Sequence, residues 1–268
     1  MSLLRQYIKD IQKSGKCYFT ADNAMSELKI SRKAVLNAIY RLKKTQDIIS
    51  PIRKLYVVVP PAYQNIGSIP ATELVPIVMQ YLNREYYACL LSAAEIHGAS
   101  HQKPQIFQVM TNRRMRNISC GHVVIKFLYQ KYIDPDFIQN IVVNTGYLKV
   151  STPEYTARDL FLYTNQAGGI NHIATVLSEL IEAINVDKFM DLASYYKSKT
   201  WVQRFGYILD NIDPMDTDKQ QAILKALRRY LSKKELVYVP LTPDMPSTDC
   251  TRNKKWKIIE NTTIESDI

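Results

Sequence analysis

Apolar residues recur three or four positions apart through the first forty residues of the chain, which predicts amphipathic helices. The first such set consists of Leu3, Leu4, Tyr7, Ile8 and Ile11. Ser14-Gly15 ends this predicted helix, because glycine is a common residue just past a helix C-terminus. Thr20 is a candidate N-cap for a second, shorter helix. That helix carries the apolar residues Ala24, Met25 and Leu28.

A third helix is predicted after a short turn at residues 28–31, with Ser31 as its N-cap. Its buried stripe is predicted to consist of Val35, Leu36, Ile39 and Leu42. The β-branched run over 55–59 predicts a strand, and the preceding Ile52-Arg53-Lys54 predicts a basic hairpin tip. Three helices followed by a two-stranded hairpin is the element order of a winged helix-turn-helix.

Three prolines and a glycine lie between residues 60 and 70, and this composition is typical of a linker. We therefore expect a winged helix-turn-helix over 1–60, a linker over 61–70 and a larger mixed α+β domain over 71–268. Ser151-Thr152-Pro153-Glu154 predicts a helix start, with a hydroxyl cap followed by proline. The other helices are expected over 71–82, 85–97, 170–183, 186–196, 201–209 and 219–231. Strands are expected over 105–111, 122–129 and 147–151, with short strands near Tyr238 and at 256–259 closing the sheet.

Positive charge is concentrated at the N-terminus. The chain has 35 Lys+Arg and 25 Asp+Glu, a net charge of +10, and residues 1–60 hold 12 of these cations and only 4 of the acids. A basic module beside a nearly neutral one is typical of a nucleic-acid-binding domain joined to a second domain. A solvated lysine-rich surface, or a winged helix that docks a protein, would carry the same charge. The agreement of charge, capping and element order favours DNA binding.

The candidate DNA-binding residues follow from how a helix-turn-helix reads DNA. The N-terminal part of its second helix reaches base edges in the major groove, where Arg32 suits guanine and Asn37 suits adenine. Lys44 and the two cations of the hairpin tip are better placed for phosphates. Tyr40 fits the edge of the core equally well, and we assign it no contact. The candidates are Ser31, Arg32, Lys33, Asn37, Arg41, Lys44, Arg53 and Lys54.

A second basic cluster, Arg113, Arg114 and Arg116, follows the strand predicted over 105–111 and therefore lies on a loop. One interpretation is a second nucleic-acid contact, either to DNA that flanks the operator or to RNA. The other interpretation is a solvated hairpin tip, which requires no ligand. The sequence leaves both open.

Sequence patterns of catalysis are absent: there is no P-loop, dinucleotide-binding glycine motif or G-x-S-x-G. His97 and His101 are four residues apart, but Gly98 lies between them and no third metal ligand is near. The four cysteines form no C-x-x-C pair. We expect no enzymatic activity, cofactor or metal. Neither a bilayer-spanning apolar run nor a signal peptide is evident, so we expect a cytoplasmic protein without a membrane partner.

Five stretches carry a resemblance to a known family: 85–99, 101–111, 146–160, 168–170 and 203–209. In this order they resemble the type IV abortive-infection antitoxins of the AbiEi family, which also have an N-terminal winged helix. The resemblance implies a bacterial transcriptional autorepressor that binds inverted repeats in its own promoter. It also implies an antitoxin in phage defence that counteracts a cognate nucleotidyltransferase toxin, without requiring a stable complex. A ligand-sensing transcription factor without antitoxin activity is the alternative. Residues beyond about 235 resemble the family less clearly.

Overall fold

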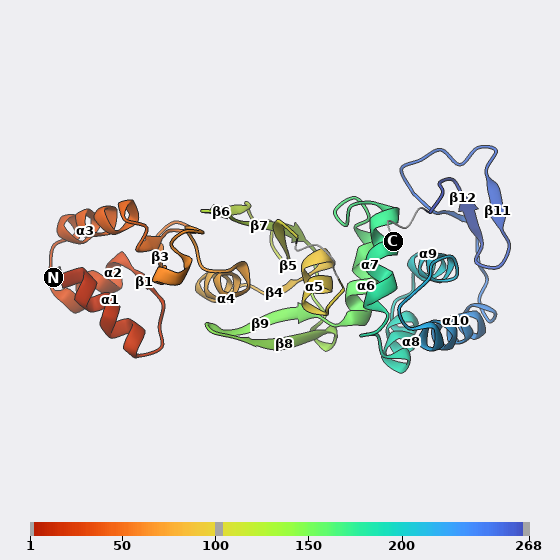
Figure 1. Cartoon of the computed structure of the whole chain (residues 1–268), viewed down its shortest axis with the longest axis horizontal. Helices are drawn as coiled ribbons and strands as arrows, with labels where there is room; N and C mark the ends of the chain where they lie inside the picture. Colours follow the sequence, from red (N-terminus) through yellow and green to blue (C-terminus); the bar gives the residue numbers. More distant parts are fainter. Residues whose placement is uncertain (1–2, 100–103, 265–268) are drawn as a thin grey trace. The chain divides into compact units, whose positions relative to one another are not determined.

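The computed structural model describes residues 3–99 and 104–264 of the chain (Figure 1). The chain folds into two compact units, and it passes between them more than once. One unit consists of residues 1–88 and 105–150, and the other of residues 89–104 and 151–268. The division expected at residues 61–70 therefore lies inside the first unit.

The first sixty residues form three helices and a small antiparallel sheet. In chain order these are α1 (Leu3–Lys13), β1 (Tyr18–Thr20), α2 (Ala21–Leu28), α3 (Arg32–Lys44), β2 (Ile48–Ile49) and β3 (Leu55–Val58). Both predicted N-caps are confirmed: Thr20 Oγ1 accepts from the Asn23 amide at 3.1 Å and Ser31 Oγ accepts from the Ala34 amide at 3.3 Å. Strand β1 is too short to predict from sequence, and it pairs with β3 so that the sheet order is β1-β3-β2.

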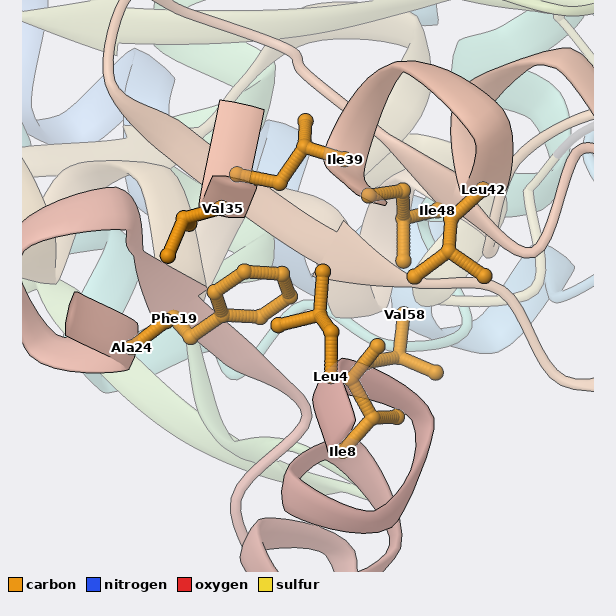
Figure 2. Packing of buried hydrophobic residues seen from close by; sticks show 9 residues of the cluster. All are labelled: Leu4, Ile8, Phe19, Ala24, Val35, Ile39, Leu42, Ile48 and Val58. Carbon is orange, nitrogen blue, oxygen red and sulfur yellow. The ribbon is translucent and has the colours of Figure 1, made fainter. Parts of the chain in front are cut away.

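A single apolar core joins all six of these elements. Figure 2 shows the buried side chains that form it, Leu4, Ile8, Phe19, Ala24, Val35, Ile39, Leu42, Ile48 and Val58. The ring of Phe19 meets Tyr7 edge-on, with centroids 5.8 Å apart, and stacks on Tyr56 at 5.5 Å. Complete burial of one such aromatic side chain contributes about 1.5–3 kcal/mol to folding. This core fixes which face of α3 is left for solvent.

Residues 61–70 form an ordered connection. They begin with a short 3-10 helix (Pro61–Tyr63), and Ser68 and Ile69 are buried. The carbonyl oxygen of Ile66 accepts a hydrogen bond from the His122 amide at 2.9 Å. A Cβ on Gly121 would lie 2.1 Å from the same carbonyl oxygen. The turn around Gly121 therefore packs directly on the backbone of this connection.

A six-stranded sheet forms the rest of the first unit, and α4 (Ala71–Leu82) contacts β7. Its strand order is β6-β7-β5-β4-β9-β8. The central strands β5 and β7 are parallel, and the short strand β4 is antiparallel to β5 and parallel to β9. The strands are β4 (Tyr86–Ala88), β5 (Ile106–Thr111), β6 (Ile118–Cys120), β7 (Val123–Tyr129), β8 (Ile138–Val143) and β9 (Gly146–Ser151).

The helix predicted over 85–97 is partly wrong. Residues 86–88 form strand β4, and only Leu90–Ile96 form a helix, α5. Tyr86 and Tyr87 are both buried because β4 lies inside the sheet. A strand that is buried on both faces has no alternation of apolar and polar residues, so its sequence does not distinguish it from a buried helix. Strands β6 and β8 were not predicted either.

Most of the second unit is helical. After α5 it contains α6 (Pro153–Leu162), α7 (Ile170–Leu180), α8 (Val186–Tyr195), α9 (Thr200–Leu209) and α10 (Thr217–Leu231). The N-cap predicted for α6 is confirmed, because Thr152 Oγ1 accepts from the Tyr155 amide. Glu154 does more than favour the helix dipole: it is buried, and its Oε1 accepts the Asn185 amide at 2.8 Å. Among the described residues no helix has the length and apolar content to cross a bilayer.

Three short strands between residues 239 and 260 form a separate small sheet, so the expectation that the strands near Tyr238 and at 256–259 close the larger sheet is wrong. Its order is β10-β12-β11, from β10 (Val239–Pro240), β11 (Thr251–Asn253) and β12 (Ile258–Glu260). Helix α9 holds this sheet through Gln203 Nε2, which donates to the Trp256 carbonyl at 3.1 Å, and Arg204 Nε, which donates to the Pro240 carbonyl at 3.0 Å. Gly206 leaves room for the buried Trp256 ring. Gln203, Arg204 and Gly206 of the Gln-Arg-Phe-Gly stretch therefore hold the small sheet on α9.

Candidate nucleic-acid interface

Helix α3 has one buried and one exposed face. Val35, Ile39 and Leu42 are buried in the core. The candidate residues Arg32, Lys33, Asn37, Arg41 and Lys44 are all exposed, as is the cap residue Ser31. The predicted burial of Leu36 is wrong: its side chain is 40% exposed, because α3 is rotated so that Leu36 lies on the outer side.

Tyr40 lies on this outer face as well, with 70% of its surface exposed. Lys33, Leu36 or Asn37, Tyr40 and Lys44 follow one another at three- or four-residue spacing, so they line the same side of the helix. The sequence alone does not decide whether Tyr40 lies at the edge of the core or on the surface. The missing information was the rotation of α3 about its own axis, which the core contacts of Val35 and Ile39 determine.

The turn between α2 and α3 is short and has a fixed geometry. Lys29 caps α2 in the left-handed conformation, with φ +52°. The chain reverses through Ile30 and reaches Ser31, which caps α3. Helices α2 and α3 contact each other, and α3 also contacts β2. Two helices joined by a turn of three or four residues have the form of a helix-turn-helix pair.

Arg53 and Lys54 are exposed in the loop that connects β2 to β3. Lys54 has φ +71°, and the loop is closed by hydrogen bonds from Ser50 Oγ at 3.1 Å and from the Leu55 amide at 3.3 Å, both to the Ile52 carbonyl. Strand β2 pairs with β3 antiparallel, so the two cations are at the tip of a hairpin, as predicted. Since α3 contacts β2, the hairpin and the outer face of α3 belong to one packed domain.

The candidate cations have no counter-charge among the described residues. Helix α3 contains no acid. Across residues 3–99 and 104–264, the ion pairs involve other cations, such as Arg5 with Asp47 at 2.8 Å and Lys13 with Asp10 at 3.5 Å. Arg41 Nε instead donates to the carbonyl of Asn37 at 3.4 Å, one turn back along its own helix. This surface is therefore suited to attract a polyanion.

Arg113, Arg114 and Arg116 lie on the loop between β5 and β6, as predicted, and all three are exposed. The loop is not a hairpin tip, because β7 lies between β5 and β6 in the sheet. The guanidinium carbon of Arg114 is 5.7 Å from the centre of the Tyr129 ring. This cluster belongs to the six-stranded sheet and is separate in sequence from α3 and the β2–β3 hairpin.

The structure describes only one member of the histidine pair, His97. His101 lies outside the described residues. His97 Nε2 is 2.7 Å from the Ser151 carbonyl oxygen, which can only accept, so this nitrogen carries a proton and has no lone pair for a metal. Burial lowers the pKa of His97 below its usual value. Within the described residues, no three His, Cys, Asp or Glu side chains gather in a group that could hold a metal ion.

Comparisons with known proteins find similarity to a family within one part of the chain and to a solved structure along most of it. The AbiEi antitoxin C-terminal domain family matches residues 86–211. The whole chain is also similar to the crystal structure of the RV2827C protein from Mycobacterium tuberculosis. The TM-score is 0.65 and the identity 14%, covering 94% of this chain and 89% of that one. At such low identity this likeness shows the fold alone. No curated protein matches the chain.

The matched residues begin at β4 and end just after α9. They include strands β4 to β9 and helices α5 to α9, while the first sixty residues and the small C-terminal sheet lie outside the match. The match confirms the resemblance that the sequence stretches between 85 and 209 carry. The similarity to the AbiEi antitoxin C-terminal domain family therefore covers residues 86–211, just under half of the chain.

Proposed function

We propose that the chain is a DNA-binding transcriptional autorepressor and a type IV antitoxin. Residues 1–60 act as a winged helix-turn-helix that binds inverted repeats in the promoter of its own operon. The AbiEi domain counteracts a cognate nucleotidyltransferase toxin encoded alongside, in defence against phage. The observation that carries the DNA-binding part is the outer face of α3, which is basic, exposed and without acids.

The positions of the side chains support the following mechanism on DNA. Helix α3 enters the major groove with its N-terminal end, where Arg32 and Lys33 are exposed and reach base edges. Asn37 and Tyr40 continue the same face one and two turns further along the helix. Arg53 and Lys54, on the β2–β3 loop, bind phosphates and fix the orientation of the domain without reading sequence.

Replacing Arg32 by alanine should weaken binding to the promoter fragment by about 5–150-fold, the loss of one base-reading arginine, about 1–3 kcal/mol. Binding to scrambled DNA should change little. Lys54→Ala should weaken both DNAs alike and reduce the slope of log K against log salt by about one. Fluorescence anisotropy from about 50 to 200 mM salt measures both effects. Equal losses on the two DNAs for Arg32→Ala would contradict its role as a base reader.

The antitoxin part is tested by co-expression with the adjacent toxin from a promoter that the protein does not regulate. We expect growth rescue by the full chain and equal rescue by the double variant Arg32→Ala, Arg53→Ala, because the AbiEi domain carries the neutralising activity. Point variants are preferable to removing residues 1–70, since Ile66 and Gly67 pack on the turn at Gly121. Failure of the unchanged chain to rescue growth would refute the antitoxin proposal and favour a ligand-sensing regulator.

A further inference from the structure

Two basic and aromatic segments emerge side by side at one end of the six-stranded sheet. Strands β5 and β7 are parallel neighbours, and their last residues, Thr111 and Tyr129, are register partners. The segments that follow them therefore leave the sheet at the same edge. The amide of Gln130 donates to the Thr111 carbonyl at 3.1 Å, which ties the beginnings of the two segments together.

The first segment supplies cations and the second supplies mainly rings. Arg113, Arg114 and Arg116 follow β5 and are exposed. Tyr129 ends β7 with 44% of its surface exposed, and Tyr132, three residues on, is 65% exposed. Lys131 between them is exposed. Arg114 lies over the Tyr129 ring, which confirms that the segments meet. We call this set of residues the basic-aromatic edge.

Nearby acids do not neutralise the basic-aromatic edge. Glu85 accepts a hydrogen bond from Asn112 Nδ2 at 2.8 Å, and Asp134 is buried, with its Oδ1 accepting the Asp136 amide at 3.2 Å. Asp136 is exposed in the short helix that follows. Within the described residues, none of the four exposed cations forms an ion pair with these three acids. Within the described part of the chain, the Tyr132 hydroxyl has no hydrogen-bond partner and its ring has no aromatic neighbour.

We propose that the basic-aromatic edge binds an unpaired nucleic-acid strand. Exposed aromatic rings stack on base faces, and arginines beside them bind the phosphates of the same strand. A duplex does not offer its base faces, because they are stacked inside the helix. Cations alone would suit any polyanion, so Tyr129 and Tyr132 are what select a single strand. This site is distinct from the duplex-binding surface of α3 and does not depend on it.

The test uses the full chain and labelled oligonucleotides of about 12 nucleotides, within the range that such sites cover. Oligo(U), oligo(dT) and a hairpin duplex of equal length are compared by anisotropy. Tyr132→Leu should weaken binding of single strands by about 5-fold or more, the effect of removing one stacking ring, whereas Tyr132→Phe should bind like the unchanged chain. The matched control is Tyr147→Leu, because Tyr147 is also 65% exposed but lies on β9.

The arginines are tested separately through salt dependence. The double variant Arg113→Gln, Arg116→Gln should lower the slope of log K against log salt on single strands by up to about 1.4, roughly 0.7 for each phosphate that the variant no longer neutralises. The double variant Arg229→Gln, Lys233→Gln, which removes two exposed cations at and just beyond the end of α10, serves as the charge-matched control. Tighter binding of oligo(U) than of oligo(dT) would support the site and identify its ligand as RNA.

Three results would overturn the proposal. The first is that the unchanged chain retains neither oligo(U) nor oligo(dT). The second is that Tyr132→Leu and Tyr147→Leu bind single strands with equal affinity. The third is that the hairpin duplex binds more tightly than either single strand, and that its affinity falls when Arg113 and Arg116 are replaced but not when Tyr132 is replaced. Promoter binding by Tyr132→Leu should equal that of the unchanged chain. A failure of the single-strand site is therefore distinguishable from a failure of the proposed promoter binding.

Discussion

Asp159→Asn should lower the free energy of unfolding by about 3–5 kcal/mol, because it removes one partner of a buried ion pair and leaves the other charged. Arg158 Nη1 donates to Asp159 Oδ1 at 3.1 Å, and the two side chains are 11% and 0% exposed. The guanidinium lies 3.8 Å from the centre of the Tyr196 ring and 5.2 Å from that of Tyr155. Arg158 thus cannot turn to water without disturbing these rings.

Tryptophan fluorescence follows the unfolding of the second unit, because both tryptophans, Trp201 and Trp256, belong to it. Urea unfolding followed by tryptophan fluorescence should show the shift. Arg228→Ala, which breaks a partly exposed ion pair with Asp210 in the same unit, with side chains 48% and 20% exposed, should cost at most about 1 kcal/mol. The double variant Arg158→Met, Asp159→Leu should recover part of the stability, since it leaves no unpaired buried charge. A decrease for Asp159→Asn no larger than that for Arg228→Ala would contradict the role of the Arg158–Asp159 pair.

Gly121→Ala should lower the free energy of unfolding by about 2–5 kcal/mol, from left-handed backbone strain and a backbone clash together. Gly121 has φ +55°, and a Cβ there would lie 2.1 Å from the Ile66 carbonyl oxygen and 2.8 Å from the Gly67 Cα. Neither atom belongs to a side chain that could rotate away. The substitution should also separate the connection over 61–70 from the β6–β7 turn, and weaken the hydrogen bond from the His122 amide.

Gly15→Ala separates the two causes, because Gly15 has φ +76° and no atom within 4 Å of an added Cβ. It should cost only the conformational strain, about 1–2 kcal/mol. Urea unfolding followed by circular dichroism compares the variants, and equal slopes against urea concentration would show that the native state stays compact. Hydrogen exchange at the His122 amide should rise in Gly121→Ala and stay unchanged in Gly15→Ala. Equal destabilisation by both would show that the close packing at Gly121 contributes nothing.

Local interactions were predictable from the sequence. The N-caps at Thr20, Ser31 and Thr152 were confirmed because each joins a side chain to an amide only three residues away. The helix over 71–82 and the strands at β5, β7 and β9 followed from periodicity and β-branched residues. The stretches between 85 and 209 gave the resemblance to the AbiEi family, which the family match over residues 86–211 confirms, since they are a property of the sequence alone. Charge also located the basic module within residues 1–60.

Tertiary structure decided the features that depend on distant residues. Leu36 and Tyr40 lie outside because the core contacts of α3 set its rotation, and β4 is a strand because β5 and β9 flank it. The three strands between residues 239 and 260 form a separate sheet, which Gln203 and Arg204 hold on α9. Arg114 meets Tyr129 only because β5 and β7 are parallel neighbours. The order of strands in a sheet depends on residues far apart in the chain and cannot be read from a short stretch of sequence. The basic-aromatic edge is therefore evident only in the folded chain.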